Sequence, residues 1–419
     1  MADSFYRVGT ANMYDSAIRN LGARQKSLVD LQENLTSGKR VVRPSDDPVA
    51  AAQAERALTR LTRIQTEQRQ LEVQKGNIAQ AESTLGDAVG LVQEIRQTIV
   101  AAGGGTLTQD DRKTYAMQLQ SLQDQLKEVI NRKDVNGMPL LGSLGSALAP
   151  FIGPLPGAPD YVFNGLPGQN ASEGAAIASQ MDGHAALMFD PVRDGVYTAT
   201  LARGSATSTM FSSAVKTSHL QQLDGASYAL QVTGVTTTGG TTSVNYALTK
   251  TARDGTVTTS TGSTPAVLSG QPMPVTITEG PDTVVQFTLQ GTPAAGDTVT
   301  VAPSASLMSS VQSAINGIAN APDSIQAAQA SNSALASIDA GLQRLSNVRG
   351  YAGELLNRAD RISGDQESRS VQLEGDRSNA EDLDMIKGIS DFQNANAGYE
   401  AALKSYASVQ KLSLFNFIN

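Results

Sequence analysis

Side chains able to carry acid–base, metal or nucleophilic chemistry are few in this sequence. Its 419 residues include two histidines, His184 and His219, and no cysteine. The acids around these histidines have neither the spacing of a zinc site nor that of a catalytic triad. The lack of cysteine also removes thiolate catalysis, disulfides and cysteine metal ligands. We therefore predict that the chain is not an enzyme and holds no cofactor or metal, and we interpret both histidines as ordinary surface or strand residues.

Two other groups resemble chemical motifs but are better explained as helix boundaries. Asp46 and Asp47 are adjacent carboxylates that come directly before Pro48, where a helix can begin. An aspartate is a favoured N-cap, proline suits the first helical position, and negative charge is stabilised at that end of a helix. The triplet Gly103-Gly104-Gly105 has no strand before it and no Gly-Lys-Ser/Thr sequence, so we do not expect it to bind phosphate.

Charge and hydropathy argue against two classes of partner. The formal net charge of -8 does not suit nucleic-acid binding, which requires a basic face. The longest charge-free apolar stretch, Leu140–Ala158, contains three prolines and several glycines, so we expect no insertion into a membrane. No cationic segment followed by an apolar run opens the sequence, and we therefore expect no cleaved signal peptide.

The most distinctive stretch is a bend between two predicted helices. The first helix is expected from about Ala11 to Ser37, and Gly38 suits the left-handed residue that follows a helix. Pro44 and Pro48 prevent simple continuation, so a second helix must start afresh after Asp47. The residues of this bend are Ser37, Gly38, Lys39, Arg40, Pro44, Ser45, Asp46, Asp47 and Pro48. Its basic residues, together with Arg43, belong either to a solvated turn or to salt bridges with a neighbouring subunit.

Seven-residue apolar repeats on both sides of a β-rich segment define the fold. The second helix carries such a repeat from Ile64 to Ile99 within a proline-free run that would be a rod of ~80 Å. Helical spacing is predicted again near Leu307–Ile318, along Ile338–Ile362 and from about Ala380 to Leu414. One helix cannot bury such a seam alone, so helices from both ends of the sequence must pack together.

Between these helices, Gly, Pro, Ser and Thr become dense and the heptads disappear. Short alternating runs predict strands at Ala185–Phe189, Val196–Leu201, Tyr228–Val235, Ser243–Leu248, Val275–Thr278, Val284–Leu289 and Thr298–Val301. The sequence therefore predicts an α+β fold: an elongated antiparallel helical bundle or coiled-coil trunk formed by both termini, with an inserted all-β domain. We expect three domains, comprising residues 1–44 with 378–419, residues 45–142 with 304–377, and residues 143–303.

The two terminal helices carry apolar seams that are too narrow for an independent fold. Burying about a dozen apolar side chains at ~2 kcal/mol each does not offset the ordering of about sixty residues at ~1.5 kcal/mol each. We predict that these helices are mobile in the monomer and become ordered between subunits. The predicted interface residues are Tyr14, Leu21, Leu28, Leu31, Leu35, Met385, Ile389, Phe392, Tyr399, Leu403, Tyr406, Val409, Leu412, Phe415 and Phe417.

The bend and its two helices resemble a known family. The pattern SGKRV..PSDDP..AA at residues 37–52 resembles the N-terminal region of bacterial flagellins and their relatives, and the tail LSLFNFIN at residues 412–419 is similar to the family's C-terminal tail. The form PSDDPVAA looks most like the family members at the hook–filament junction. The resemblance implies a structural protein of the bacterial flagellum that reaches the cell exterior through the flagellum's own export channel.

The resemblance also implies partners. These are other copies of the chain in a ring-like axial assembly, the first hook-associated junction protein, flagellin, and an export chaperone that binds the C-terminal helix. Two alternatives stay open. One is flagellin itself, which shares the terminal helices but commonly has alanine where this chain has Pro48. The other is a secreted coiled-coil adhesin that binds a host ligand through the β insertion.

Overall fold

A computed structural model describes residues 10–156, 160–170 and 174–418, with the side chains of residues 10–14 and 409–418 outside that description. The chain divides into two compact units. Unit 1 comprises Met1–Arg69 and Ser363–Asn419, and unit 2 comprises Gln70–Ile362. Unit 1 therefore combines segments from both ends of the sequence, whereas unit 2 is one continuous segment. The combination of helices from both ends with a central β-rich insertion confirms the predicted α+β class.

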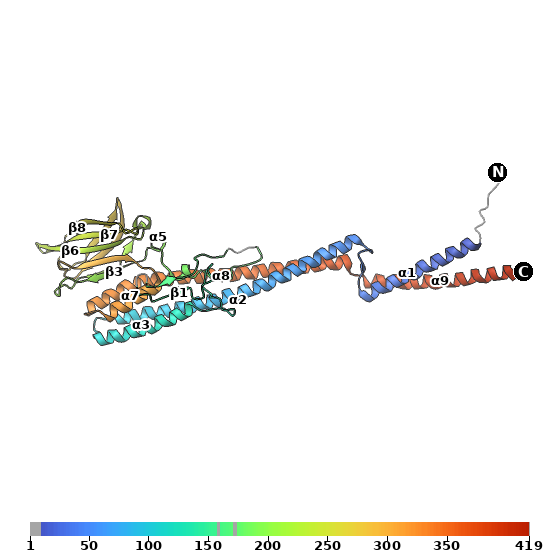
Figure 1. The fold of residues 1–419 in the computed structure, drawn as a ribbon, viewed down its shortest axis with the longest axis horizontal. Helices are drawn as coiled ribbons and strands as arrows, with labels where there is room; N and C mark the ends of the chain where they lie inside the picture. Colours follow the sequence, from blue (N-terminus) through green and yellow to red (C-terminus); the bar gives the residue numbers. More distant parts are fainter. Residues whose placement is uncertain (1–9, 157–159, 171–173, 419) are drawn as a thin grey trace. The chain divides into compact units, whose positions relative to one another are not determined.

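Unit 1 contains α1 (Thr10–Ser37), α9 (Met385–Ile418), the start of α2 (Pro48–Ala102) and the end of α8 (Ser324–Glu381). Helices α1 and α9 lie side by side and run antiparallel (Figure 1). Leu35 approaches Gly388 near the bend, and Arg24 approaches Gly398 further along the pair. The predicted first helix is confirmed.

Unit 2 has a helical part built from α2, α3 (Gln109–Ile130), α7 (Leu307–Ala319) and α8 (Figure 1). The heptad residues of α2 from Ile78 to Ile99 are fully buried, as are Ile338 and Leu345 of α8. Thr108 begins α3 with a capping box, because its hydroxyl accepts from the Asp111 N–H while the Asp111 carboxylate accepts from the Thr108 N–H. The predicted trunk helices are therefore present, although the helical spacing predicted near Ile338–Ile362 lies inside one much longer helix.

Among its described residues, the β part of unit 2 forms three sheets. The largest sheet has the strand order β3-β12-β6-β7-β8, and β9 also pairs with β7. The second sheet has the order β10-β11-β4, and β5 also pairs with β11. The third sheet pairs β1 with β2. The inward faces of the two larger sheets share one apolar core. The strands are β1 Phe151–Ile152, β2 Val162–Phe163, β3 Tyr197–Ala202, β4 Phe211–Ser212, β5 Lys216–Thr217, β6 Ser227–Thr238, β7 Thr241–Thr251, β8 Val257–Ser263, β9 Val267–Leu268, β10 Met273–Glu279, β11 Asp282–Gln290 and β12 Thr298–Pro303.

The structure differs from the predicted strands at two places. The strand predicted at Ala185–Phe189 is wrong, because Gly183–Leu187 forms the short helix α4. The Asp182 carboxylate accepts a hydrogen bond from the Ala185 N–H at 3.1 Å and so caps a helical turn, which a five-residue apolar run cannot reveal by its periodicity. The strand β8 was not predicted, because the run Val257–Ser263 is almost uniformly polar and does not alternate.

Two more short helices, α5 (Pro191–Asp194) and α6 (Leu220–Leu223), connect the strands of unit 2. The β part is attached to the helices of the same unit by hydrogen bonds. The Ser333 hydroxyl on α8 donates to the Ala199 carbonyl on β3 at 3.0 Å, and the Gln329 side-chain oxygen accepts from the Ser212 N–H at 2.6 Å. In the described part of the chain, no helix has a segment sufficiently long and apolar to span a bilayer.

Candidate assembly surface

The bend holds the α8–α9 turn through backbone hydrogen bonds. Gly38 has φ = +72°, a conformation that glycine adopts without strain, and its carbonyl accepts from the Leu383 N–H at 2.9 Å. The Arg40 N–H donates to the Glu381 carbonyl at 2.7 Å, and Lys39 and Asp382 form an antiparallel bridge. A conformation set locally by Gly38 therefore joins the two ends of the sequence within unit 1.

Side chains of the bend reinforce this contact. The Arg40 guanidinium donates to the Ala380 carbonyl at 2.7 Å and pairs with Asp47 at 3.2 Å. Lys39 pairs with Glu381 at 3.2 Å, and Arg43 pairs with Glu33 at 2.8 Å. All three basic residues thus have acidic partners inside the chain, a pairing that the sequence pattern did not predict. These pairs are partly exposed, so each contributes little to stability by itself.

The start of α2 is capped by the bend. The Asp47 carboxylate accepts from the Ala50 N–H at 3.0 Å, and this hydrogen bond, together with the one from Arg40, holds the pKa of Asp47 below its usual range. Asp46 instead accepts from the Arg43 N–H at 2.8 Å. The two carboxylates therefore serve separate turns, as their interpretation as helix-start residues predicts. A small apolar cluster of Val41, Ala50, Ala54 and Ala380 packs beneath them.

The apolar seams of α1 and α9 are incompletely covered. Among the residues of these two helices whose burial is described, only Gly388 is buried. The predicted interface residues that are half-buried are Leu21, Leu28, Leu31, Leu35, Phe392, Tyr399 and Tyr406. Those that are exposed are Met385, Ile389 and Leu403. The side chains of Tyr14, Val409, Leu412, Phe415 and Phe417 lie outside the described residues.

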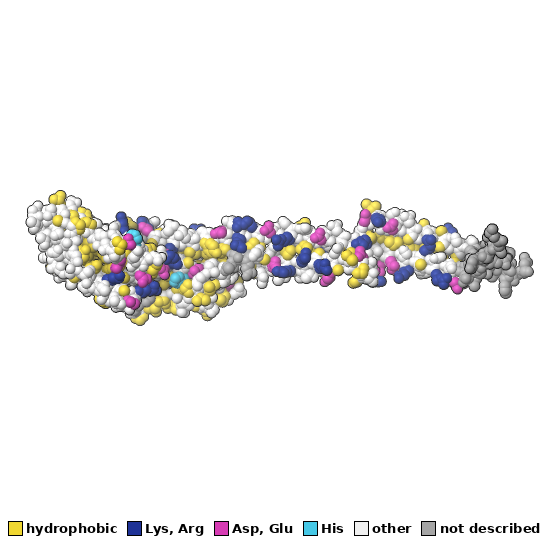
Figure 2. All heavy atoms as spheres, turned by 90° about the horizontal axis from the view of Figure 1, so that it is seen from above, with side chains coloured by type: hydrophobic (Ala, Val, Ile, Leu, Met, Phe, Trp, Pro, Cys, Tyr) yellow, Lys and Arg dark blue, Asp and Glu magenta, His cyan; other side chains and the backbone are white. Residues whose placement is uncertain are grey.

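Further apolar side chains of unit 1 are exposed beyond the predicted seam. Ile386 at the start of α9 is 86% exposed, and Val49 and Leu58 on α2 are also exposed. In the view of Figure 2, hydrophobic side chains show between charged ones along this part of the surface. Sequence periodicity missed Ile386 because it lies beside, and not on, the heptad line through Met385 and Phe392. Exposed apolar groups gathered on one surface are typical of a protein–protein contact.

A groove lies along the start of α2. We call it the bend groove, and its lining residues are Lys39, Val41, Val42, Arg43, Pro44, Pro48, Ala51, Ala52, Ala54, Glu55, Leu58, Arg377 and Glu381. Most of its lining residues are apolar, and the charged ones are Lys39, Arg43, Glu55, Arg377 and Glu381. The combination suits a peptide or helix surface better than a small charged ligand.

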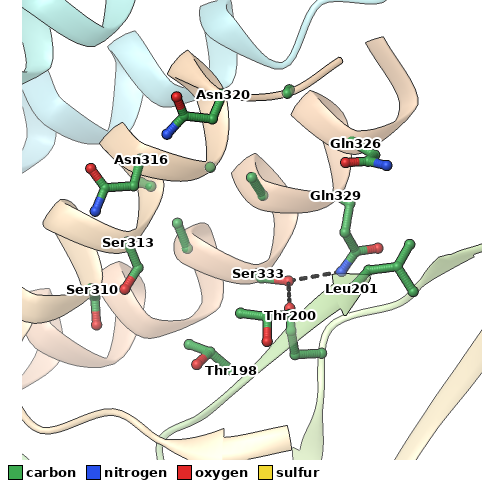
Figure 3. Close-up of a pocket in the computed structure, with 16 residues that line it drawn as sticks. Thr198, Thr200, Leu201, Ser310, Ser313, Asn316, Asn320, Gln326, Gln329 and Ser333 are labelled. Atoms are coloured by element: carbon green, nitrogen blue, oxygen red, sulfur yellow. Dashed lines mark hydrogen bonds between the residues drawn. The ribbon is translucent and has the colours of Figure 1, made fainter. Parts of the chain in front are cut away.

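Unit 2 holds the histidines and a cavity without acid–base residues. His184 lies on α4, with its ring edge toward Phe163, and burial lowers its pKa. His219 lies 3.8 Å from Asp282, near the exposed surface. The cavity is lined by neutral side chains of β3, α7 and α8, including Thr200, Asn316 and Ser333 (Figure 3). Within residues 10–156, 160–170 and 174–418, no group of three or more His, Cys, Asp or Glu side chains could hold a metal ion.

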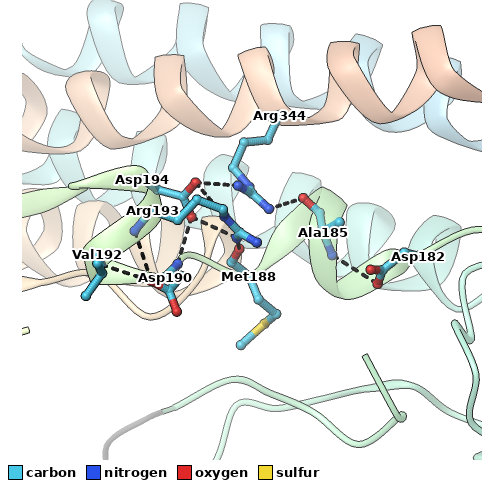
Figure 4. Close-up of polar contacts among 8 residues, drawn as sticks. All are labelled: Asp182, Ala185, Met188, Asp190, Val192, Arg193, Asp194 and Arg344. Atoms are coloured by element: carbon cyan, nitrogen blue, oxygen red, sulfur yellow. Dashed lines mark hydrogen bonds and ion pairs between the residues drawn. The ribbon is translucent and has the colours of Figure 1, made fainter. Parts of the chain in front are cut away.

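A largely but not fully buried ion pair ties α8 to the entry of the β part. The Arg344 guanidinium pairs with Asp194 on α5 and donates to the Ala185 carbonyl (Figure 4). Burial alone would raise the pKa of Asp194, but hydrogen bonds from Arg193 and the Asp190 N–H, with the charge of Arg344, outweigh it and lower the pKa. This cluster is a structural clamp, because Arg193 and Arg344 both pair with Asp194.

Comparison with known proteins identifies the bend and its helices. Residues 8–144 match the model of the bacterial flagellin N-terminal helical region. The N-terminal part of the chain is similar to this helical region of bacterial flagellins. The matched region includes the signature of the bend at residues 37–52, so the resemblance drawn from those residues is confirmed.

The curated proteins that this chain resembles include a flagellar hook-associated protein and flagellins. Over 149 residues the chain is 34% identical to flagellar hook-associated protein 3 of Salmonella typhimurium, a match that covers 35% of this chain and 46% of the relative. It is 26% identical over 129 residues to flagellin of Listeria monocytogenes, covering 31% of this chain and 45% of that flagellin. The chain thus spans about half the length of the curated relatives it matches.

Solved structures share the fold over a larger part of this chain. Flagellar hook associated protein-3 from Legionella pneumophila superposes with a TM-score of 0.59 at 21% identity, covering 78% of this chain and 97% of that one. FlgL from Xanthomonas campestris superposes with a TM-score of 0.56 at 21% identity, covering 78% and 99%. These similarities extend the shared α+β fold well beyond the N-terminal region.

Proposed function

We propose that the chain is a structural component of the bacterial flagellum, an adaptor at the hook–filament junction that links the first junction protein to the flagellin filament. It catalyses no reaction in this role. The 34% identity to flagellar hook-associated protein 3 supports the assignment to the junction. The observation that carries the assembly role is the incomplete burial of the seams of α1 and α9. Apolar side chains left uncovered in one copy gain free energy when neighbouring copies cover them.

The assembly mechanism follows from these terminal helices. Copies self-associate around a common axis in a ring-like assembly, with the predicted interface residues of α1 and α9 buried between subunits. The bend keeps both terminal helices attached to the trunk, since it joins residues 38–41 to residues 380–383 by backbone and side-chain hydrogen bonds. The terminal helices form the inner domain, residues 45–142 with 304–377 the trunk domain, and residues 143–303 the outer domain.

The junction role implies a location and a set of partners for the protein. The protein lies outside the cell at the hook–filament junction, after export without a cleaved signal peptide. Its partners are other copies of itself, the first junction protein, flagellin, and an export chaperone that holds α9 before export. Partial exposure of the α9 side chains suits such a chaperone, because helix-binding proteins recognise an exposed apolar stripe.

A deletion of residues 390–419 tests this function in the source bacterium. We expect cells with hooks but without filaments, because most of α9 is lost. Deletion of residues 143–303 should spare hook–filament assembly, since it removes the β part and leaves the bend and the terminal helices. Normal filaments in the first strain would refute the proposal. Loss of host-ligand binding with normal motility in the second strain would favour the adhesin alternative.

Flagellin is the second candidate, supported by the 26% identity to Listeria flagellin. Purified protein added to isolated hooks distinguishes the two functions. We expect a short cap that stops growing and then accepts flagellin. Continuous growth into long filaments from this chain alone would assign it as the filament subunit.

A further inference from the structure

The cavity of unit 2 is formed by residues outside the terminal helices that carry the proposed assembly. It lies between β3, α7 and α8, and all of its lining residues belong to unit 2 (Figure 3). Its volume is about 220 Å³. One molecule of liquid water takes up about 30 Å³, so the cavity holds several waters. It is therefore large enough for a small molecule that displaces them.

Part of the cavity wall is apolar and made of very short side chains. Ala314 and Gly317 of α7 and Ala330 and Ala334 of α8 line it. The two helices approach closely here, since a Cβ added at Gly317 would lie 2.6 Å from the Cβ of Ala330. These residues offer a ligand carbon–hydrogen surface and no side-chain hydrogen bond.

Polar side chains at the cavity have unused hydrogen-bonding groups. Among the described residues, the side chains of Ser313, Asn320 and Gln326 make no hydrogen bond or ion pair. Asn316 accepts a hydrogen bond from Gln312 at 3.2 Å, and its own amide N–H groups have no acceptor in the described part of the chain. Ser313, Asn316 and Asn320 are exposed, so their free groups are open to solvent. Side-chain amides and hydroxyls both donate and accept hydrogen bonds.

The free edge of β3 adds backbone groups to the cavity. β3 is the end strand of its sheet and pairs with β12. The Val196 carbonyl accepts from the Ser304 N–H on the β12 side, whereas the Ala199 carbonyl accepts from the Ser333 hydroxyl on the helix side. Alternate residues of a strand direct their backbone groups to opposite edges. Leu201, which lines the cavity two residues after Ala199, therefore directs its N–H and carbonyl to the helix side.

The lining of the cavity favours one class of ligand. None of its 16 lining residues carries a charge at neutral pH. A charged ligand group would lose hydration there without gaining a counter-charge. Hydroxyl groups can instead replace water molecules and form the same hydrogen bonds with amides and hydroxyls of the protein. The lining thus suits a neutral compound that carries several hydroxyls on a compact carbon skeleton.

We infer that the cavity binds a neutral polyhydroxyl compound of about monosaccharide size. The side-chain amides of Asn320 and Gln326 and the backbone of Leu201 hold its hydroxyls, and the alanine wall contacts its carbon skeleton. The dissociation constant is of millimolar order, because the ligand exchanges hydrogen bonds with water for protein hydrogen bonds of similar strength. This binding activity goes beyond the proposed junction function and does not depend on it.

Saturation-transfer difference NMR on the full chain tests the ligand class. The probes are D-glucose, D-galactose and D-mannose, added one at a time. We expect transfer to at least one of them, with a dissociation constant of millimolar order on titration. D-glucuronate, which adds a carboxylate to the same kind of ring, should bind at least about tenfold more weakly. N-acetylglycinamide, which has amide groups and no hydroxyl, should bind more weakly than the neutral sugar.

Three alanine variants test the place of binding. Asn320→Ala and Gln326→Ala each remove one amide from the cavity and should each weaken sugar binding by about two- to tenfold, the usual effect of one lost hydrogen bond. The matched control is Asn332→Ala, which removes an exposed amide of α8 that does not line the cavity. It should bind the sugar like wild type. Urea midpoints equal to wild type would show that the variants are folded, and the two cavity amides lie on different segments, so each variant is a separate test.

The outcomes decide each part of the inference. No transfer to any of the three neutral sugars overturns the site. Equal binding of D-glucuronate, or tighter binding of N-acetylglycinamide, overturns the ligand class. Wild-type affinity in both Asn320→Ala and Gln326→Ala overturns the assignment to this cavity. The hook–filament function is decided separately, by the deletion of residues 390–419 in cells, because it depends on the terminal helices.

Discussion

The close approach of α7 and α8 makes Gly317→Ala a sensitive test of how unit 2 is packed. A Cβ added at Gly317 would lie 2.6 Å from the Cβ of Ala330 on α8. Carbon atoms in contact prefer separations of about 3.5–4.0 Å, so the new atom would be about 1 Å too close. The Ala330 methyl is fixed to its backbone and cannot rotate away. The two helices must therefore separate at this point.

The sign of the effect follows from two opposing terms. Alanine in a helix interior is favoured over glycine by about 1 kcal/mol. Overpacking a well-packed contact costs about 1–3 kcal/mol, and the upper part of that range applies because no rotamer can relieve the clash. We expect Gly317→Ala to lower the free energy of unfolding of unit 2 by about 1–2 kcal/mol. The matched control is Gly353→Ala on α8, where an added Cβ meets nothing within 4 Å and stability should rise by about 1 kcal/mol.

Urea denaturation of the full chain, followed by far-ultraviolet circular dichroism, measures both variants in the same unit. The two identical substitutions should move the midpoint in opposite directions without a change in slope. A Gly317→Ala protein at least as stable as wild type would refute the close α7–α8 contact. A Gly353→Ala protein that is not more stable than wild type would instead contradict the expected gain from replacing glycine by alanine inside a helix.

Three further predictions follow from burial and charge. Arg344→Met should lower the free energy of unfolding of unit 2 by about 2–4 kcal/mol, because Arg344 and its partner Asp194 are only 14% and 10% exposed. The control is Arg349→Met, which breaks the ion pair with Glu82, whose two side chains are 47% and 30% exposed. It should lower the free energy of unfolding by less than about 1 kcal/mol in the same urea experiment. Because the folded-state pKa of Asp194 is lowered, its contribution to stability is present above the ordinary aspartate pKa of about 4 and is lost as the pH falls through the folded-state value. Unfolding measured against pH should therefore show a shallower acid decline for Asp194→Asn than for wild type, and equal slopes would contradict this assignment. In hydrogen exchange on the free monomer, amides of residues 21–35 should exchange much faster than amides of residues 78–99. The reason is that α1 has no buried side chain among those described, whereas the heptad residues of α2 from Ile78 to Ile99 are fully buried. Equal protection of the two segments would contradict the proposal that α1 becomes ordered only on assembly.

Local sequence signals predicted the helices and the bend well. The heptad residues of α2 from Ile78 to Ile99 form the buried side of that helix, as their spacing indicates. Gly38 has the positive φ that its place after a helix predicts, and Asp47 caps the helix that begins at Pro48. These features depend on a few consecutive residues or on one helical repeat, so they can be predicted without knowledge of the fold.

The structure of short or irregular segments was predicted less well. The apolar run after Asp182 became the helix α4, because a side-chain cap outweighed a weak strand pattern. The 58-residue continuity of α8 was also missed. Its first half is rich in alanine, serine and glutamine, residues whose burial depends on a close partner helix and not on a strong apolar stripe. Ser333 and Gln329 in that half are buried against the β part.

The sequence by itself determined the helical repeats, the bend at Gly38 and the resemblance of the N-terminal region to flagellins. Only the tertiary structure decided which charges pair, since Arg344 and Asp194 are 150 residues apart and Lys39 meets Glu381 from the other end of the chain. It alone also placed the bend groove and left Ile386 exposed. The physical reason is that helix periodicity and capping are local properties, whereas ion pairs and surface grooves depend on distances between segments that the order of residues does not specify.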